Sequence, residues 1–157
     1  MDIVEDNSME EPLKGYKEMV VPVTKTRLTW CKDLTFVGST QRGYEIEFDA
    51  HAQEGCQPTE ALLLSLAGCM GVDIMMILQK MRVSITSFRM DLTGERNQIP
   101  PQYFKNIDMV LHIEGKNLDS KKVDRAISLS RDKYCSVYNS FRSDTVVNVH
   151  YKLGESD

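Results

Sequence analysis

One apolar run near the middle of the chain limits what this sequence can fold into. The eighteen residues from Ala61 to Leu78 read ALLLSLAGCMGVDIMMIL, so apolar side chains cover nearly every side of a helix drawn through them. The run is long enough for a membrane span. However, the acidic Asp73 lies inside it, no second run of this kind follows, and the neighbouring segments read as strands. We therefore expect the buried central helix of a soluble domain, with no membrane partner.

The segments on both sides of this run alternate between apolar and polar residues, as half-buried strands do. Three short strands with polar turns precede it, at 23–30, 34–38 and 44–48. Such close spacing predicts an antiparallel meander. The segments that follow Pro58, which suits the first turn of the central helix, read as two strands (83–93 and 107–113), an amphipathic helix (119–134), a short further helix (135–141) and a last strand (145–151). The expected fold is α+β, with antiparallel sheets around a long buried helix in the order βββ-α-ββ-α-α-β.

Length and charge favour one soluble domain with an acidic extension. A chain of 157 residues can bury a core without disulfide or metal staples. Residues 1–20 are acidic and show little periodicity, which predicts a flexible tail before a single domain at 21–157. The tail lacks the charged and apolar regions of a secretory signal, so we expect a cytoplasmic protein. The net charge is −4 and the cations are scattered, so nucleic acid is not an expected partner.

The cysteines are the residues most suited to chemistry, and none forms a C-x-x-C pair. They are Cys31, Cys56, Cys69 and Cys135. Cys69 lies in the apolar helix beside Gly68 and Gly71, where a backbone or ligand can approach closely. Cys135 opens the short late helix near Lys133, a setting that can lower the pKa of a thiol. For either cysteine alone, a packed structural thiol is the simpler interpretation.

The acid in the apolar run needs an explanation of its own. Asp73 follows Cys69 by one helical turn and projects on a similar face. A carboxylate in such a helix requires a partner. It either orients an arginine or a substrate group, or it makes a structural ion pair or cap, and the sequence leaves both open. Its negative charge would oppose ionisation of a nearby thiol unless it is neutralised.

The histidines give no sign of a metal centre. His51, His112 and His150 lie far apart and show no ligand spacing with a cysteine or an acid. No phosphate-binding glycine loop or nucleotide fingerprint is present either. We therefore expect neither a metal nor a bound cofactor.

Three segments, taken together, resemble the OsmC/Ohr family of osmotically inducible and organic hydroperoxide reductase proteins. They are PTEALLLSLAGC from Pro58 to Cys69, the following GVDIMMILQK, and SRDKYCSV from Ser130 to Val137. The order of the expected elements is similar as well, over most of the chain. The resemblance implies an intertwined homodimer in which two central helices are wrapped by sheets, with sites at the subunit interface.

The resemblance also implies roles for the two cysteines of these segments. Cys69 would attack the peroxide oxygen, and Cys135 would resolve the resulting sulfenic acid as a disulfide that an external dithiol reduces. Apolar walls would favour organic hydroperoxides, and the side chains expected to form them are Leu62, Leu66, Met70 and Met76.

One position departs from the peroxidase members of that family. Those members carry a glutamate directly after the helix-opening proline, where it holds an activating arginine. This chain has Thr59 there and Glu60 one residue later, about 100° further around a helix. Arg27 and Arg42 are the candidates for the arginine. The leading hypothesis is a thiol peroxidase of oxidative-stress defence. The alternatives are a non-enzymatic module that binds a small apolar or acyl ligand, and a purely structural stress protein.

Overall fold

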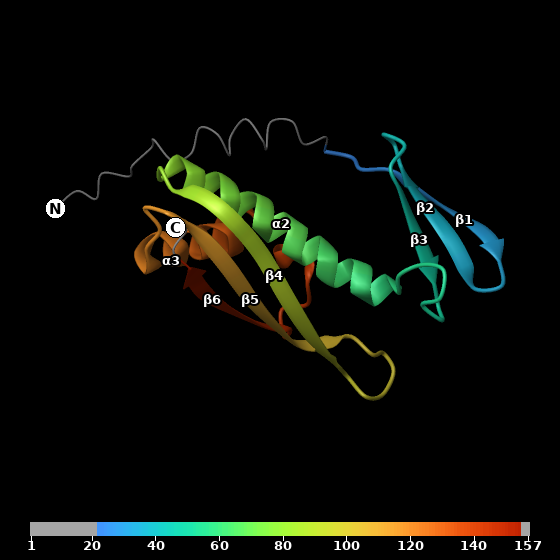
Figure 1. The fold of residues 1–157 in the computed structure, drawn as a ribbon. Coiled ribbons are helices and arrows are strands. Elements are labelled where there is room, and N and C mark those ends of the chain that lie inside the picture. The colour runs from blue at the N-terminus through green and yellow to red at the C-terminus, as the bar shows by residue number, and fades with distance from the viewer. Residues whose placement is uncertain (1–21, 155–157) are drawn as a thin grey trace. The chain divides into compact units, whose positions relative to one another are not determined.

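The computed structural model describes residues 22–154, and within them the chain forms two compact units, 22–64 and 65–154 (Figure 1). Each unit is described by itself. The tail predicted for residues 1–20 lies outside the described residues, and the single domain predicted for 21–157 stays a prediction. The α+β class and the overall order of elements agree with the sequence-based expectation.

The first unit contains a three-stranded antiparallel sheet. Its strands are β1 (Thr26–Lys32), β2 (Thr35–Thr40) and β3 (Glu45–Asp49), in the spatial order β1-β2-β3. The β2–β3 turn contains Gly43 at φ 84°, a left-handed conformation that glycine adopts without steric cost. The predicted meander is confirmed, with strand boundaries displaced by up to three residues.

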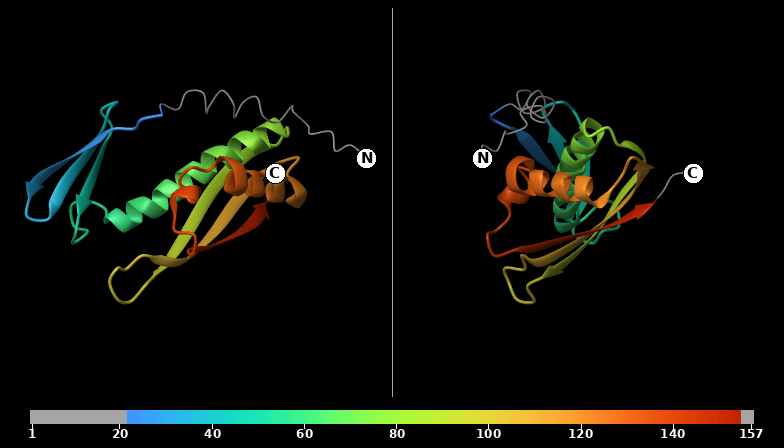
Figure 2. Two further views of the ribbon diagram at one scale, coloured as in Figure 1. Left: turned by 180° about the vertical axis from the view of Figure 1, so that it is seen from behind. Right: turned by 90° about the vertical axis from the view of Figure 1, so that its left-hand side faces the viewer.

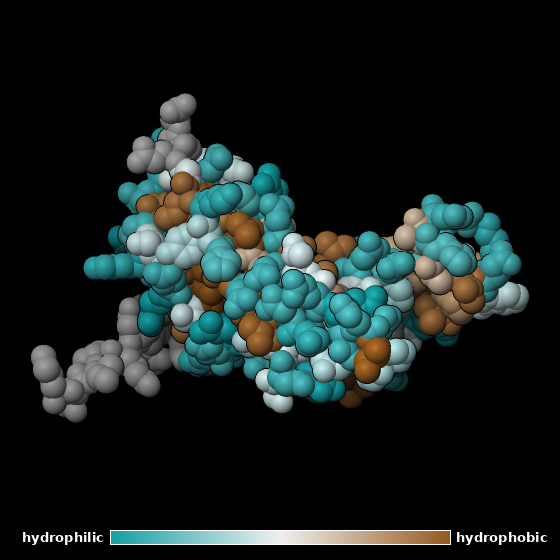
Figure 3. Space-filling model, turned by 90° about the horizontal axis from the view of Figure 1, so that it is seen from below, coloured by the Kyte–Doolittle hydropathy of each residue, from teal (hydrophilic) through white to brown (hydrophobic). Residues whose placement is uncertain are grey.

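This sheet leaves several apolar side chains exposed within its own unit. Leu28, Trp30 and Tyr44 are each more than 60% exposed. Figure 3 shows apolar residues gathered on the surface of this unit, at the right of the view. A gathering of exposed apolar side chains is typical of a surface that contacts another part of a protein or a partner.

Helix α2 (Pro58–Lys80) begins and ends with recognisable caps. At its start, the backbone N–H of Gln57 donates a 2.8 Å hydrogen bond to the carboxylate of Glu60, as in a capping box. At its end, Arg82 has a left-handed backbone (φ 60°), and the N–H of Val83 donates to the carbonyl of Leu78. This is the Schellman arrangement, which satisfies the last carbonyls of a helix. The predicted start of the helix at Pro58 is confirmed.

The second unit is built on a mixed sheet. Strands β4 (Ser84–Arg96) and β5 (Phe104–Lys116) pair antiparallel, whereas β6 (Val146–Gly154) runs parallel to β5. The expectation of purely antiparallel sheets is therefore wrong at β6. The physical reason is the connection: helix α3 (Ser120–Leu129) carries the chain back across the sheet, as a crossover between parallel strands must.

Both helices of this unit cover the same face of the sheet. Figure 2 shows α2 and α3 above β4, β5 and β6 when the molecule is seen from the side. Fully buried apolar side chains of α2, β5 and α3 form the core, and they are Leu66, Met70, Ile74, Leu78, Ile107, Met109, Leu111, Ile113, Val123 and Ala126. Burial of this kind is the main favourable contribution to folding.

Helix α3 is shorter than the predicted 119–134. The carboxylate of Asp119 accepts a 2.9 Å hydrogen bond from the backbone of Lys122 and caps its start. After Leu129 the chain forms a π-helical turn at Ser130–Tyr134, here called the π turn. The short helix expected at 135–141 is wrong in extent, because only Tyr138–Ser140 is helical, in a single 3-10 turn.

Among the described residues, α2 is long and apolar enough to cross a membrane by length and composition alone. Its residues Leu66, Met70 and Ile74 are instead fully buried in the core of the second unit. Such burial is typical of the core helix of a soluble domain.

Candidate thiol site

Two segments that are distant in sequence bring three reactive side chains together in the second unit. Cys69 and Asp73 project from α2, and Cys135 directly follows the π turn. The two sulfur atoms and a carboxylate oxygen all lie within 4.8 Å of one another. Cys69 and Asp73 share a helix face because they are four residues apart. We call Cys69, Asp73 and Cys135 the thiol site.

The π turn places Cys135. The backbone N–H of Cys135 donates a 2.7 Å hydrogen bond to the carbonyl of Ser130, five residues earlier. A π turn contains one residue more than an α turn, and such turns are frequent at functional sites. Asn139 stabilises the segment, because its Nδ2 donates 2.9 Å to the Cys135 carbonyl. The sequence pattern suggested a continuous helix here and gave no sign of the turn.

Asp73 is buried and accepts a hydrogen bond from a residue that lies outside α2. It is 2% exposed, and the hydroxyl of the fully buried Ser130 donates a 2.9 Å hydrogen bond to its Oδ2. The acid therefore has the partner that its position in an apolar helix demands. The sequence-based expectations did not include Ser130 in the site. Its spacing from the apolar Ala126 and Ile127, four and three residues earlier, was the available signal.

The two cysteines differ in accessibility, and burial changes the pKa of Cys135. Cys69 is partly exposed, whereas Cys135 has no exposed surface. Burial and the hydrogen bond with Cys69 raise the pKa of Cys135 to about 12, and they outweigh the Tyr138 N–H, which donates 3.3 Å to the sulfur. Asp73 adds to this increase through its charge. Cys135 therefore remains a neutral thiol near neutral pH.

This result overturns one sequence-based expectation. Cys135 was expected to open a helix, where a lowered pKa is typical. Instead it ends the π turn with an extended backbone (ψ 103°) and lies in the core, so its pKa is raised rather than lowered.

The glycines beside Cys69 have different surroundings. A Cβ at Gly68 would meet nothing within 4 Å, whereas one at Gly71 would contact Met90 and Phe88 of β4 at 3.5–3.6 Å. The helix surface at Gly68 is thus open in this unit, next to the partly exposed Cys69.

The residues predicted to form apolar walls do not share one environment. Leu66 and Met70 are fully buried in the core, and Met76 is partly buried. Leu62 is 41% exposed and belongs to the 22–64 unit. A role for these four side chains as walls of a substrate pocket stays a prediction.

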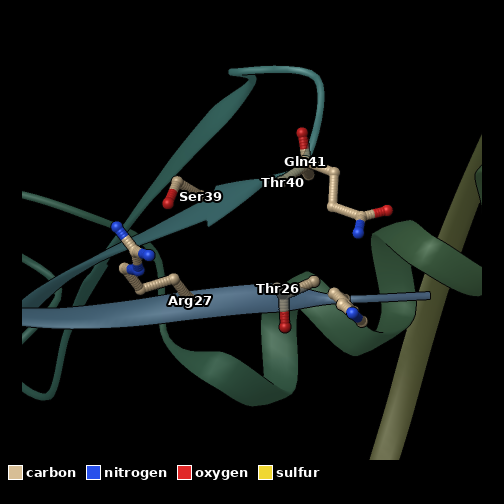
Figure 4. Close-up of a pocket in the computed structure, with 6 residues that line it drawn as sticks. Thr26, Arg27, Ser39, Thr40 and Gln41 are labelled. Carbon is tan, nitrogen blue, oxygen red and sulfur yellow. The ribbon is translucent and has the colours of Figure 1, made fainter.

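Three of the four residues considered for activation or orientation, all except Asp73, lie in the first unit. The carboxylate of Glu60 caps α2, as described above. Arg42 lies in the turn between β2 and β3, and Arg27 pairs with Ser39 across β1 and β2. Arg27 lines a surface cavity of about 420 Å³, which Figure 4 shows between Thr26, Ser39, Thr40 and Gln41. Activation of Cys69 by any of these residues stays a prediction.

The remaining cysteines are also in the first unit. The thiol of Cys31 donates to the carbonyl of Thr29, and that of Cys56 donates 3.5 Å to the carbonyl of Glu47. Both are free thiols with local hydrogen bonds, and Cys31 is exposed in β1 whereas Cys56 is partly buried before α2.

A comparison with known families identifies the chain. A profile described as OsmC-like protein matches residues 50–150, a range that contains the whole thiol site. The chain belongs to the OsmC-like family. Protein YhfA of Escherichia coli K12 is 34% identical to this OsmC-like protein over 114 residues, which are 72% of this chain and 85% of YhfA.

Solved structures share the fold of this OsmC-like protein. A hypothetical protein from Aquifex aeolicus VF5 is 28% identical and has a TM-score of 0.80, over 87% of this chain and all of that one. The organic hydroperoxide resistance protein OhrB of Bacillus subtilis has a TM-score of 0.55 at 16% identity, over 84% of this chain and 98% of OhrB. At that identity the second likeness concerns the fold alone.

Proposed function

We propose that this OsmC-like protein is a thiol-dependent peroxidase that reduces organic hydroperoxides in oxidative-stress defence. Cys69 is the peroxidatic residue and Cys135 is the resolving residue. The observation that carries the proposal is the placement of one partly exposed and one fully buried thiol within 4.8 Å of each other. The name of the fold relative OhrB, an organic hydroperoxide resistance protein, agrees with this substrate class.

The different environments of the two thiols support this division of roles. Only a thiolate attacks a peroxide efficiently, and the raised pKa of Cys135 keeps that thiol protonated at neutral pH. Cys69 is also the thiol that a substrate can reach from solvent. The nucleophile is therefore Cys69, and Cys135 reacts afterwards.

The reaction proceeds in three steps, which are peroxide reduction, disulfide formation and reduction of the disulfide. The Cys69 thiolate attacks one oxygen of the O–O bond, forms a sulfenic acid and expels an alkoxide, which takes a proton and leaves as the alcohol. The Cys135 sulfur then attacks the Cys69 sulfur, gives its proton to the departing hydroxide, and a disulfide and water result. An external dithiol reduces the disulfide by exchange, so the protein needs no bound cofactor.

The same proposal includes a cytoplasmic homodimer. Val72 is 41% exposed and Gly68 is open on the face of α2 beside Cys69. A second copy of the chain would cover this face and enclose the apolar approach to the sulfur, which favours organic over hydrogen peroxide. A reducing compartment such as the cytoplasm supplies the dithiol. Sedimentation of a monomer at micromolar concentration would exclude the dimer.

The test is hydroperoxide consumption with matched cysteine variants. The parent protein with dithiothreitol should consume cumene hydroperoxide. Cys69→Ser should abolish turnover, and Cys135→Ser should stop after one equivalent with a sulfenic acid that dimedone traps. Cys31→Ser and Cys56→Ser, at the free thiols of the other unit, serve as controls and should keep full activity. Equal consumption by the parent, Cys69→Ser and Cys135→Ser would exclude the mechanism.

A specific observation favours a second candidate function, the binding of a small apolar or acyl ligand without chemistry. Thr59 occupies the position of the glutamate that peroxidase members carry, and the carboxylate of Glu60 is bound to the N-terminus of α2. A binding module would show a thermal shift with a fatty acid, and Cys69→Ser would leave that shift unchanged. A peroxidase would show the loss of turnover described above.

A further inference from the structure

We propose that the reduced thiol site binds one zinc-type divalent transition-metal ion, with Cys69, Asp73 and Cys135 as three ligands and a fourth position open. The inference does not depend on peroxidase activity, and it goes beyond the function proposed above. The histidine spacing in the sequence gave no indication of a metal site. The two sulfurs and the carboxylate meet only in the folded chain.

The donor atoms select the class of cation. Two thiolates and a carboxylate are a ligand set that Zn²⁺ accepts, whereas Mg²⁺ and Ca²⁺ require oxygen ligands. In a tetrahedral zinc site with Zn–S bonds of about 2.3 Å, two sulfurs lie roughly 3.8 Å apart. The three ligand atoms of this chain lie within 4.8 Å of one another. Side-chain adjustment of about one ångström or less would thus close the site around an ion.

The surroundings hold the ligands as the outer shell of a metal site does. The hydroxyl of Ser130 donates to Asp73 Oδ2 and fixes the orientation of the carboxylate. Cys135 is held through its sulfur by Tyr138 and through its carbonyl by Asn139. Asp73, Ser130 and Cys135 are at most 2% exposed, so these groups are fixed in the core.

A cation can reach the site from solvent, and it binds in exchange for protons. Cys69 is the partly exposed member, so an ion from solvent can reach the site at this residue. Thiols bind a metal ion as thiolates, so binding releases their protons to solvent.

The redox state of the cysteine pair controls this site. A disulfide between Cys69 and Cys135 leaves no thiolate for the metal, so only the reduced protein binds it. A bound ion in turn occupies the sulfur that would attack a peroxide. The reduced protein thus exists in a metal-bound form with Cys69 protected and a metal-free form with Cys69 available.

Cobalt reports directly on thiolate ligation, so Co²⁺ is the first probe. Anaerobic titration of the reduced full-length protein with Co²⁺ should give one ion per chain, with a near-ultraviolet sulfur-to-cobalt charge-transfer band and visible bands of tetrahedral cobalt. Addition of Zn²⁺ should remove these bands by displacement. Oxidation with diamide before the titration should abolish them.

Matched variants locate the ion. Cys69→Ser and Cys135→Ser should each lose about half of the charge-transfer intensity and bind at least tenfold more weakly, while Cys31→Ser and Cys56→Ser should titrate like the parent. Ser130→Ala keeps all three ligands and should weaken binding by roughly 10–100-fold, because an outer-shell partner is lost. Circular dichroism of each metal-free variant verifies that it is folded.

The outcomes that would overturn the proposal are specific. The first is the absence of a thiolate charge-transfer band in the reduced parent. The second is an unchanged titration in the Cys69→Ser/Cys135→Ser double variant. The third is a loss of metal binding in Cys31→Ser or Cys56→Ser. Because the readout is metal binding, its failure would leave hydroperoxide consumption to be decided by its own assay.

Discussion

Ser130 and Asp73 are 57 positions apart in sequence, yet the hydroxyl of Ser130 donates a 2.9 Å hydrogen bond to the buried carboxylate of Asp73. This bond joins α2 to the π turn at the point where the two cysteines meet. The position of Cys135 relative to Cys69 therefore depends on a polar contact as well as on apolar packing.

Removal of that donor should destabilise the fold. Ser130→Ala leaves a buried carboxylate without one of its hydrogen bonds, which typically costs about 1–3 kcal/mol. Urea denaturation should show a decrease of this size in the free energy of unfolding. Ser136→Ala, at an exposed serine of the same segment, is the control and should change it little. Equal effects of the two substitutions would show that the Ser130 contact is not stabilising.

The thiols should react with iodoacetamide in the order of their exposure. The exposed Cys31 should react first, the partly exposed Cys69 next, and the buried Cys135 last. The pKa of Cys135 is raised to about 12, so its reactive thiolate stays a small fraction of the thiol at pH 8 and at pH 10, and its modification should be the slowest of the three at both values. Peptide mass spectrometry over time measures each rate. Modification of Cys135 as fast as Cys31 in the native protein would contradict this environment.

Acid should weaken the loop that follows β3. The backbone N–H groups of His51, Glu54 and Gln53 donate to the carboxylate of Asp49 and hold its pKa below the ordinary value of 3.8. A group with a depressed pKa stabilises the folded state above its unfolded pKa, and this contribution is lost as the pH falls through the folded pKa. Asp49→Asn should therefore lower the melting temperature at pH 7 and have a smaller effect at pH 3.

The matched control for that experiment is Asp33→Asn, at an exposed aspartate of the same unit. It should change the melting temperature little at either pH. If Asp49→Asn were equally destabilising at both values of pH, the loop would not depend on the charge of Asp49.

Truncation of the core face of β5 should cost far more than truncation of its outer face. Leu111 is fully buried beneath the helices, so Leu111→Ala should lower the free energy of unfolding by about 2–5 kcal/mol. Its neighbour Val110 lies on the opposite face and is partly exposed, so Val110→Ala should cost clearly less. Chemical denaturation of both variants tests the assignment of faces.

Much of the fold follows from local patterns in the sequence. Alternation in β1 to β3 predicted the first sheet, and the apolar run after Pro58 predicted α2, because periodicity reflects which face of an element is buried. The parallel direction of β6 did not follow, since alternation is the same for both directions of pairing. Direction depends on the connection, which here crosses the sheet through α3.

The thiol site was predictable in part. Cys69 and Asp73 could be placed on one helix face from their spacing alone. The partnership of Asp73 with Ser130, and the raised pKa of Cys135, could not be derived in this way. Both depend on the π turn, a local change in helical geometry that propensity and hydrophobic pattern do not encode.

The crossover between β5 and β6 affects the order in which parts of the chain fold. Cys135 lies on the connection that precedes β6, and β6 pairs with β5 over its whole length from Val146 to Gly154. Contacts between segments so distant in sequence tend to form late. Closing the long loop between them costs conformational entropy before the stabilising contacts are made. We therefore expect a nascent chain to hold Cys69 without a fixed Cys135 until the chain beyond α3 has docked. Pairing of β6 with β5 would then be the step that completes the surroundings of both thiols.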